Sequence, residues 1–452
     1  MKRYIYTLLA VALSVMVCMP LSAQDDREHT LKVYNWADYL DLSLIEEFEQ
    51  WYEEQTGEPV KVMYSTFDIN ENMLTEIEIG QEDYDVVCPS EYIIERMLRK
   101  NLLQPINKDY GPNTPNWLGN VSKFAEDKFQ QMGDGKVNVS DYAVGFMWGT
   151  TGILYNTKLV KEEEVRSWNV IFNPRFEGKI LMKDAFRDIY SVMVCLANYD
   201  DIKAGKVTRD KLVAEVTDEN ITRVEDVMFR AKKQIGGWEV DFGKERMTQE
   251  KAWLNVTWSG DATWAIEEAA EVGCNLDYIV PEEGSNCWFD GWVIPIYAKN
   301  TKAASYWINF MCKSENAVRN MNEIGYVSVI GTKEVMDAMV DDEIEEAYDL
   351  SYFFLGVEGA DSIHINPVMY PDRSVVERCA LMHDTAEKNE AMIAMWSRIK
   401  GNNLDTKMLT FIITVIVVIV ASVVWHKLKI WRKRKQRRHR LKAVHKHMQR
   451  MK

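Results

Sequence analysis

The chain has 452 residues, enough for two or three domains of ordinary size, and a formal net charge of −15. Residues 427–452 hold 13 Lys and Arg and no Asp or Glu, and without the two basic ends residues 24–406 carry −31. Such an acidic segment disfavours nucleic acid and anionic substrates and attracts cations. Residues 24–406 contain no CxxC spacing and only three histidines, so no zinc or other metal site is expected.

The N-terminal segment has the pattern of a secretory signal. Lys2 and Arg3 precede an apolar run, and small residues up to Ala23 offer a cleavage site. We therefore predict a signal peptide over residues 1–23. The apolar run is too short to be a comfortable membrane span.

The C-terminal segment has a different pattern. Met408 begins a continuous apolar run of about the 20 residues that a membrane-spanning helix needs. This predicts a transmembrane helix over 408–426, with a buried core helix as the alternative. The positive-inside rule then places the basic tail 427–452 in the cytoplasm and residues 24–406 outside the inner membrane.

The first part of the outer segment alternates between strand and helix patterns. Ser43 with Glu46 forms a capping-box pattern that predicts a helix start, and Gly57 predicts the end of that helix. In chain order the predicted elements are strand 31–34, helix 43–56, strand 60–64, helix 73–79, strand 84–87 and helix 92–102. This order predicts a largely parallel sheet with helices on both faces and a ligand site beyond the carboxyl ends of the strands.

A second unit of mixed character is predicted over roughly residues 149–284. Beyond it, apolar residues predict a strand over 288–296 and a helix over 303–311. An acidic helix is predicted over Val335–Leu350, and a last helix over 387–400.

Five aromatic–acidic clusters follow predicted strands. An elongated organic cation with ammonium groups at its ends would need carboxylates at the ends of its site and aromatic faces along its length. One such cluster is usually core followed by a solvated loop, but five on one α/β scaffold indicate a cation site. The clusters are Trp36-Ala37-Asp38-Tyr39, Ser90-Glu91-Tyr92, Asp184-Ala185-Phe186-Arg187-Asp188, Trp258-Ser259-Gly260-Asp261 and Trp288-Phe289-Asp290.

Residues 30–401 resemble the periplasmic spermidine/putrescine-binding proteins, the substrate-binding components of polyamine ABC importers. The resemblance rests on the order and spacing of VYNWADYL, YDVVCPSEY, MWGTTGILYN, SWNVIFNPRFEGKI, TWSGDATWA, IVPEEGSNCWFDGWVIP, INFM and IGYVSV. It implies an α/β, two-lobed periplasmic binding protein fold (type II) with a ligand cleft between the lobes. The implied boundaries are 30–148 and 289–335 for lobe one, and 149–288 and 336–401 for lobe two.

The resemblance also implies which residues bind the ligand. Trp258 and Trp288 would sandwich the methylene chain, Asp290 and Asp188 would each pair with an ammonium group, and Asp38 and Asp261 would lie at the opposite end. The implied aromatic residues are Trp36, Tyr39, Tyr92, Trp258, Trp288 and Tyr326, and the implied polar residues are Asp38, Ser90, Asp188, Asp261 and Asp290.

Two departures from spermidine-preferring members bear on the ligand. Ala185 stands where they have an extra aspartate, and Met382 stands where they have a glutamine. Together with Asp261, these differences favour putrescine while leaving spermidine open. The membrane helix is a further departure, because most members from two-membrane cells are free in the periplasm.

The expected role is therefore binding without catalysis, with no cofactor. The expected partners are putrescine or spermidine, the permease subunits of a polyamine ABC importer, and the inner membrane through the C-terminal helix. Two alternatives stay open at this stage: the same fold with another small cationic metabolite, and a carbohydrate-active enzyme, since paired carboxylates and tryptophans also line glycosidase clefts.

Overall fold

The computed structural model describes residues 27–133, 135–240, 242–401, 410, 413–419, 421–422, 425–427 and 429. The predicted signal peptide lies outside these residues, as do much of the predicted membrane span 408–426 and most of the basic tail. Within the described ranges, no helix combines the length and the apolar character that crossing a membrane requires. The described residues up to Met392 form one compact unit, and those from Ile393 onward form a second.

One continuous series of paired strands forms the framework of the first unit. The order is β2-β1-β3-β10-β5-β8-β6-β7, with β9 and β11 also paired to β5, and β4 and β12 also paired to β10. The strands are β1 Thr30–Trp36, β2 Lys61–Phe67, β3 Val86–Val87, β4 Leu103–Gln104, β5 Ala143–Asn156, β6 Ile180–Lys183, β7 Ile235–Glu239, β8 Leu254–Trp258, β9 Leu276–Ile279, β10 Ser285–Pro295, β11 Val327–Ser328 and β12 Cys379–Leu381.

The helices alternate with strands up to residue 99, whereas those over residues 186–231 follow one another without a strand between them. The helices are α2 Ser43–Thr56, α3 Asn70–Glu78, α4 Glu91–Arg99, α5 Lys123–Gln130, α6 Glu162–Val165, α7 Phe186–Ala197, α8 Tyr199–Lys203, α9 Arg209–Ala214, α10 Asp218–Ala231, α11 Gly243–Thr248, α12 Ser259–Glu271, α13 Thr301–Met311, α14 Ser314–Ile324, α15 Lys333–Ala338, α16 Arg373–Glu377 and α17 Asn389–Gly401. The predicted strands and helices of residues 30–102 are all present, and β1 pairs in parallel with both β2 and β3, so the predicted parallel arrangement is confirmed.

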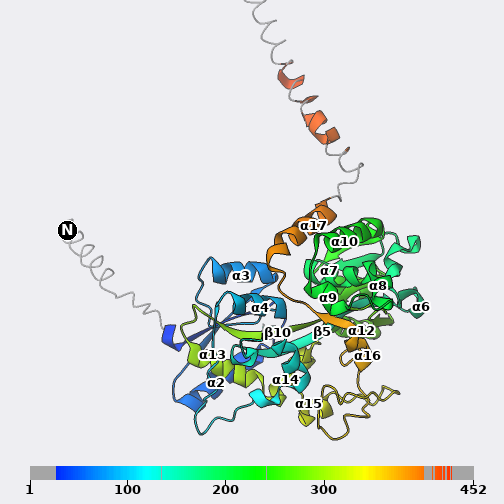
Figure 1. Cartoon of the computed structure of the whole chain (residues 1–452). Coiled ribbons are helices and arrows are strands. Elements are labelled where there is room, and N and C mark those ends of the chain that lie inside the picture. Colours follow the sequence, from blue (N-terminus) through cyan, green and yellow to red (C-terminus); the bar gives the residue numbers. More distant parts are fainter. Residues whose placement is uncertain are drawn as a thin grey trace, which may run out of the picture. The chain divides into compact units, whose positions relative to one another are not determined.

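Two strands are shared by two groups of strands and helices. β5 pairs with β10 as far as Thr150 and with β8 from Thr151 onward. Every residue of β5 and of β10 is buried. In Figure 1 these two strands run between the helices α2, α3, α4 and α13 on one side and the helices α7, α9, α10 and α12 on the other. The chain therefore crosses between the two groups along β5 and β10.

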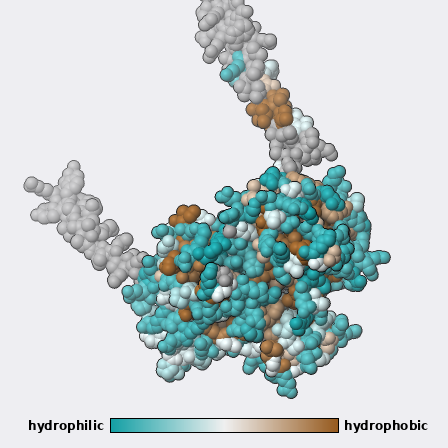
Figure 2. All heavy atoms as spheres, in the orientation of Figure 1, coloured by the Kyte–Doolittle hydropathy of each residue, from teal (hydrophilic) through white to brown (hydrophobic). Residues whose placement is uncertain are grey.

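Aromatic side chains fill the core around the crossing strands. The Trp148 ring on β5 stacks on Phe289 of β10, with ring centroids 5.7 Å apart, and on Phe353, 5.6 Å away. Trp148, Trp292 and Trp307 are fully buried, whereas the face drawn in Figure 2 is largely hydrophilic. This packing fixes β10, which carries Trp288 and Asp290.

Two local predictions need correction. The predicted helix Val335–Leu350 is present only as α15, because the acidic run after it places like charges three and four residues apart. That run instead pairs its backbone with residues 363–364. The helix starts at Ser43 as predicted, but the predicted Ser43–Glu46 capping box is not what caps it. Instead, the Asp41 carboxylate accepts a hydrogen bond from the Ser43 backbone amide at 2.9 Å.

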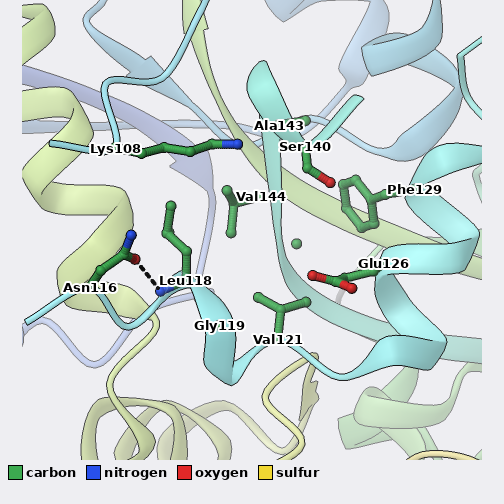
Figure 3. A pocket seen from close by; sticks show the side chains of 11 residues that line it. Lys108, Asn116, Leu118, Gly119, Val121, Glu126, Phe129, Ser140, Ala143 and Val144 are labelled. Carbon is green, nitrogen blue, oxygen red and sulfur yellow. Dashed lines mark hydrogen bonds between the residues drawn. The ribbon is translucent and has the colours of Figure 1, made fainter. Parts of the chain in front are cut away.

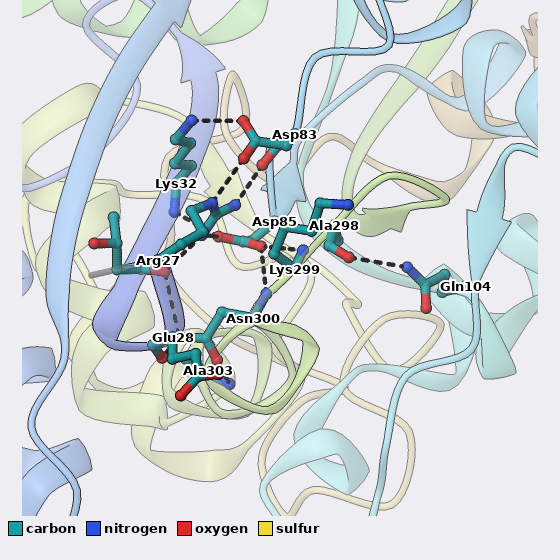
Figure 4. Close-up of polar contacts among 11 residues, drawn as sticks. Arg27, Glu28, Lys32, Asp83, Asp85, Gln104, Ala298, Lys299, Asn300 and Ala303 are labelled. Carbon is teal, nitrogen blue, oxygen red and sulfur yellow. Dashed lines mark hydrogen bonds and ion pairs between the residues drawn. The ribbon is translucent and has the colours of Figure 1, made fainter. Parts of the chain in front are cut away.

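Asp85 ties the start of β1 to the segment after β10 (Figure 4). Its carboxylate accepts hydrogen bonds from Arg27 Nη1 at 2.8 Å and from the backbone amides of Lys299 and Asn300 at 2.8 and 2.7 Å. Asp85→Asn should lower the free energy of unfolding by about 2 kcal/mol, since hydrogen bonds to a charged group are lost. Urea denaturation measures this. Asp83→Asn is the control, because that partly exposed carboxylate should contribute less.

Candidate ligand-binding site

Most of the predicted site residues lie where strands end and helices begin. Tyr39 follows β1, Ser90 directly precedes α4, and Trp258 is the last residue of β8. Asp188 and Asp261 lie in the first turns of α7 and α12. Helix N-termini favour negative charge, so the fold gathers carboxylates at the carboxyl ends of its strands.

Asp290 lies opposite an irregularity in β5, where Phe146 is the extra residue between the partners of Asp290 and Gly291. The β5–β10 register shifts between Asp290 and Gly291, and bulges of this kind redirect a side chain. Asp290 Oδ2 accepts a hydrogen bond from the Tyr39 hydroxyl at 2.8 Å, and Oδ1 accepts one from Ser90 Oγ at 2.6 Å. Asp290 is buried, and burial, with a contribution from the charge of Asp188, raises its pKa to about 7 despite these hydrogen bonds.

Ser90 connects Asp290 to Tyr92. Asn70 Nδ2 donates to Ser90 Oγ at 2.9 Å and to the Tyr92 hydroxyl at 3.2 Å. The Tyr92 hydroxyl in turn donates to Glu71 at 3.2 Å. Asn70 thus fixes both residues of the predicted Ser-x-Tyr pair on the same side of the site.

Asp188 is a second buried carboxylate, and it lies on α7, in the group of strands and helices that contains β6 and β8. Its Oδ1 accepts hydrogen bonds from Asn286 Nδ2 at 2.9 Å and from Trp258 Nε1 at 3.3 Å. Burial raises the pKa of Asp188, although these donors oppose the shift. The indole nitrogen of Trp258 is therefore directed at the carboxylate, and its ring lines the same space.

Asp261 is paired with lysine side chains of the protein itself. Lys183 Nζ lies 2.5 Å from Asp261 Oδ2, Lys244 Nζ lies 3.6 Å from Oδ1, and the Tyr326 hydroxyl donates to Oδ1 at 2.8 Å. Burial alone would raise the pKa of Asp261, but the two lysines outweigh it and the pKa is lowered. Asp261 is therefore held as a carboxylate by the protein itself.

The aromatic residues connect the three carboxylates. The Tyr326 ring lies 5.1 Å from that of Tyr39 and 5.5 Å from that of Trp288, between centroids. Trp288 and Trp258 are 6.5 Å apart, with their planes inclined at 66°. Two parallel rings around a methylene chain would need roughly 7–8 Å, twice a carbon contact distance, so in this structure the two indoles touch edge to face instead of forming a sandwich.

Nine of the eleven predicted site residues belong to this connected network, and two do not. Trp36 is half-buried and packs on Phe67, with centroids 4.6 Å apart. Asp38 is exposed, in a left-handed backbone conformation with φ of 50°. Neither residue has a hydrogen bond to the network in the part of the chain that the structure describes.

Sequence reasoning missed several residues of the network besides Asn70, and three of them touch its carboxylates or its strands directly. Glu91 is fully buried and accepts a hydrogen bond from the Phe289 amide at 3.0 Å; burial raises its pKa well above the ordinary value. Asn286 orients Asp188, and Lys183 pairs with Asp261. Glu91 lies within one of the quoted clusters and Lys183 directly precedes another, but neither position in the sequence indicates the contact that the side chain makes.

A separate pocket of about 180 Å³ lies elsewhere in the first group of strands (Figure 3). Its lining includes Lys108, Leu118, Glu126, Phe129 and Val144. None of the predicted site residues lines it. Within the described ranges, no group of three or more His, Cys, Asp or Glu side chains is arranged to hold a metal ion.

Close packing at Gly260 keeps Tyr326 on Asp261. A Cβ atom at Gly260 would lie 2.4 Å from the Tyr326 ring. Gly260→Ala should therefore displace Tyr326 and lower the free energy of unfolding by about 2 kcal/mol, a usual cost of overpacking, as measured by urea denaturation. Gly119→Ala is the matched control, since a Cβ there meets nothing within 4 Å; equal stability of the two variants would contradict the packing argument.

Two groups of strands joined by two crossing strands, with buried carboxylates and aromatic rings from both groups at their junction, define a two-lobed α/β binding protein. The chain belongs to the bacterial extracellular solute-binding protein family, whose profile matches residues 44–348. The predicted two-lobed fold is thereby confirmed.

Named relatives agree with this assignment. The chain is 27% identical to the spermidine/putrescine-binding periplasmic protein of Escherichia coli, over 72% of this chain and 84% of that protein. It is 26% identical to the putrescine-binding periplasmic protein SpuD of Pseudomonas aeruginosa, over 89% of this chain and 99% of that protein. The structure of the spermidine/putrescine ABC transporter substrate-binding protein PotD from Streptococcus pneumoniae aligns with a TM-score of 0.59 and 25% identity, covering 82% of this chain and 98% of that chain.

Proposed function

We propose that this protein binds putrescine or spermidine outside the cytoplasm and delivers it to the permease subunits of an ABC-type polyamine importer, without catalysing a reaction. The observation that carries the proposal is the buried pair of carboxylates, Asp290 and Asp188, bordered by the rings of Trp258, Trp288 and Tyr326. Buried anions next to aromatic faces are suited to organic ammonium groups. The printed names of the relatives support the same ligand class.

In this proposal, Asp290 and Asp188 each accept one ammonium group of the ligand. The ligand's methylene chain lies along Trp288 and Trp258, where burial contributes about 0.8 kcal/mol per methylene group. For this the two indoles must separate beyond their present 6.5 Å. Trp36, the last residue of β1, and Asp38, which follows that strand, enter the site only if the end of β1 and the segment after it move on closure of the lobes about β5 and β10.

The proposal includes a membrane tether. Residues 413–419 are helical with exposed apolar side chains, among them Ile413, Ile416 and Ile419, and the Thr414 hydroxyl donates to the Thr410 carbonyl at 2.7 Å. Such a surface is suited to lipid, and a tether would raise the local concentration of the binding protein at its permease. Full-length protein should stay in the membrane pellet after an alkaline carbonate wash; its release into the supernatant would exclude the tether.

Calorimetric titration of the purified full chain with putrescine, cadaverine, spermidine and spermine tests the ligand class. We expect saturable binding of at least one of these amines with one site per chain. A neutral oligosaccharide is the control, because the carbohydrate-active alternative predicts the opposite preference. Binding of the oligosaccharide and of none of the amines would exclude the proposed function.

A further inference from the structure

Lys183 has an unusual position for a lysine. It ends strand β6, its side chain is 1% exposed, and its Nζ lies 2.5 Å from Asp261 and 3.4 Å from Glu239. Nζ also bonds to the Val240 carbonyl. Burying an ammonium group costs several kcal/mol unless it is paired, and an apolar side chain would fill such a place at less cost.

The surroundings of Lys183 are those that a ligand amine would need. Its Nζ lies 4.2 Å from the centroid of the Trp258 ring. Trp258 and Asp261 are both residues predicted from the sequence to contact the ligand. The lysine therefore presents a primary ammonium to one carboxylate and one indole of the proposed site, with a second carboxylate, Glu239, behind it.

Most of the buried carboxylates around the site already have a partner within the protein. Lys183 and Lys244 offset Asp261 and Glu239. The guanidinium of Arg187 bonds to Thr385 Oγ1 and the His383 carbonyl and lies over the Tyr92 ring. Glu91 accepts the Phe289 amide. The hydrogen-bond donors to Asp188 (Asn286 and Trp258) and to Asp290 (Tyr39 and Ser90) are all neutral, although the nearby Arg187 charge lowers the pKa of Asp188.

We propose that Lys183 is a built-in ammonium group that occupies the Asp261 end of the binding site and so restricts the protein to diamine-sized dications. This inference rests on the proposed polyamine function and makes it more specific. In its terms Asp261 serves as the partner of Lys183 and closes one end of the site. A triamine has no carboxylate for its third ammonium group, and that group would have to approach Lys183.

The test compares putrescine and spermidine by calorimetry in the full chain and in Lys183→Met. Removing the ammonium frees Asp261 for a third ligand amine, and a hydrogen bond to a charged group should shift the affinity ratio toward spermidine by about 10- to 100-fold. Lys244→Met is the matched control: that lysine faces the same carboxylate from 3.6 Å but is 25% exposed, so the ratio should change much less. An unchanged ratio in Lys183→Met would overturn the inference.

A second variant and a second readout cover the remaining outcomes. If Lys183→Met does not fold, Lys183→Met/Glu239→Gln removes one acid together with the lysine, and the same ratio decides. If no form binds any polyamine, the proposed function fails, and the subsite is judged by rescue: n-butylamine should raise the melting temperature of Lys183→Ala and leave the unsubstituted protein and Lys244→Ala unchanged. No rescue of Lys183→Ala would then overturn the subsite as well.

Discussion

Asp290→Asn is expected to lower the affinity for putrescine about a hundredfold at pH 8, or about 3 kcal/mol in binding free energy. The carboxylate is buried between Tyr39 and Ser90, so its charge is poorly screened by water. An amide of the same shape keeps the packing but offers no charge to a ligand ammonium. Calorimetric titration of the folded variant measures the loss.

The matched control for this prediction is Asp200→Asn. It changes the net charge by the same amount, but the Asp200 side chain on α8 is 99% exposed. A change in the general acidic field would weaken binding equally in both variants. If Asp290→Asn binds putrescine as tightly as the unsubstituted protein, Asp290 does not pair with the ligand.

Much of the site could be predicted because strand ends fix where side chains gather. The carboxyl ends of parallel strands share one edge of a sheet, so the clusters after β1 and β3 had to lie close together, and so did those after β6 and β8. The ligand-binding roles of Ser90, Asp188 and Asp261, by contrast, were implied by the resemblance to the spermidine/putrescine-binding proteins.

The contacts that could not be predicted are those set by the register of strand pairing and by the direction in which long side chains extend. The parallel pairing of β6 with β8 brings Lys183 beside Trp258 and Asp261, and no spacing in the sequence encodes that contact. Asp261 was therefore expected to serve a ligand amine, whereas an amine of the protein is already bound to it. Trp36 was expected among the stacking rings, but it packs on Phe67 because β1 and β2 pair residue for residue to their ends.

Glu91 illustrates a second limit. A charged residue between Ser90 and Tyr92 reads as the exposed first turn of a helix, where acidic residues are common. The structure instead buries it completely, with Oε2 on the Phe289 amide of β10. Burial raises the pKa of Glu91 well above its ordinary value, and the nearby charges of Asp290 and Asp188 raise it further. Sequence patterns do not distinguish such a buried acid from a solvated one.

Putrescine affinity should fall about a hundredfold between pH 8 and pH 5. Burial raises the pKa of Asp290 to about 7, so below pH 7 this carboxyl is increasingly neutral and cannot pair with an ammonium group. The ligand itself stays protonated over this range, since primary amines titrate near pH 10. For one group, affinity drops about tenfold per pH unit below its pKa. Titrations at pH 5, 6, 7 and 8 measure the slope.

As pH rises, putrescine affinity should increase while the contribution of Asp290 to stability decreases. This opposite response distinguishes titration of Asp290 from acid unfolding of the whole protein. The pKa of Asp290 in the folded protein lies above its ordinary value of 3.8, so folding favours the protonated form. The contribution of Asp290 to stability is thus lost as pH rises from about 4 to about 7. In Asp290→Asn that loss is absent, so the melting temperature of the variant minus that of the unsubstituted protein should grow from pH 5 to pH 8. A constant difference, together with an unchanged pH slope of affinity in the variant, would show that Asp290 is not the titrating group.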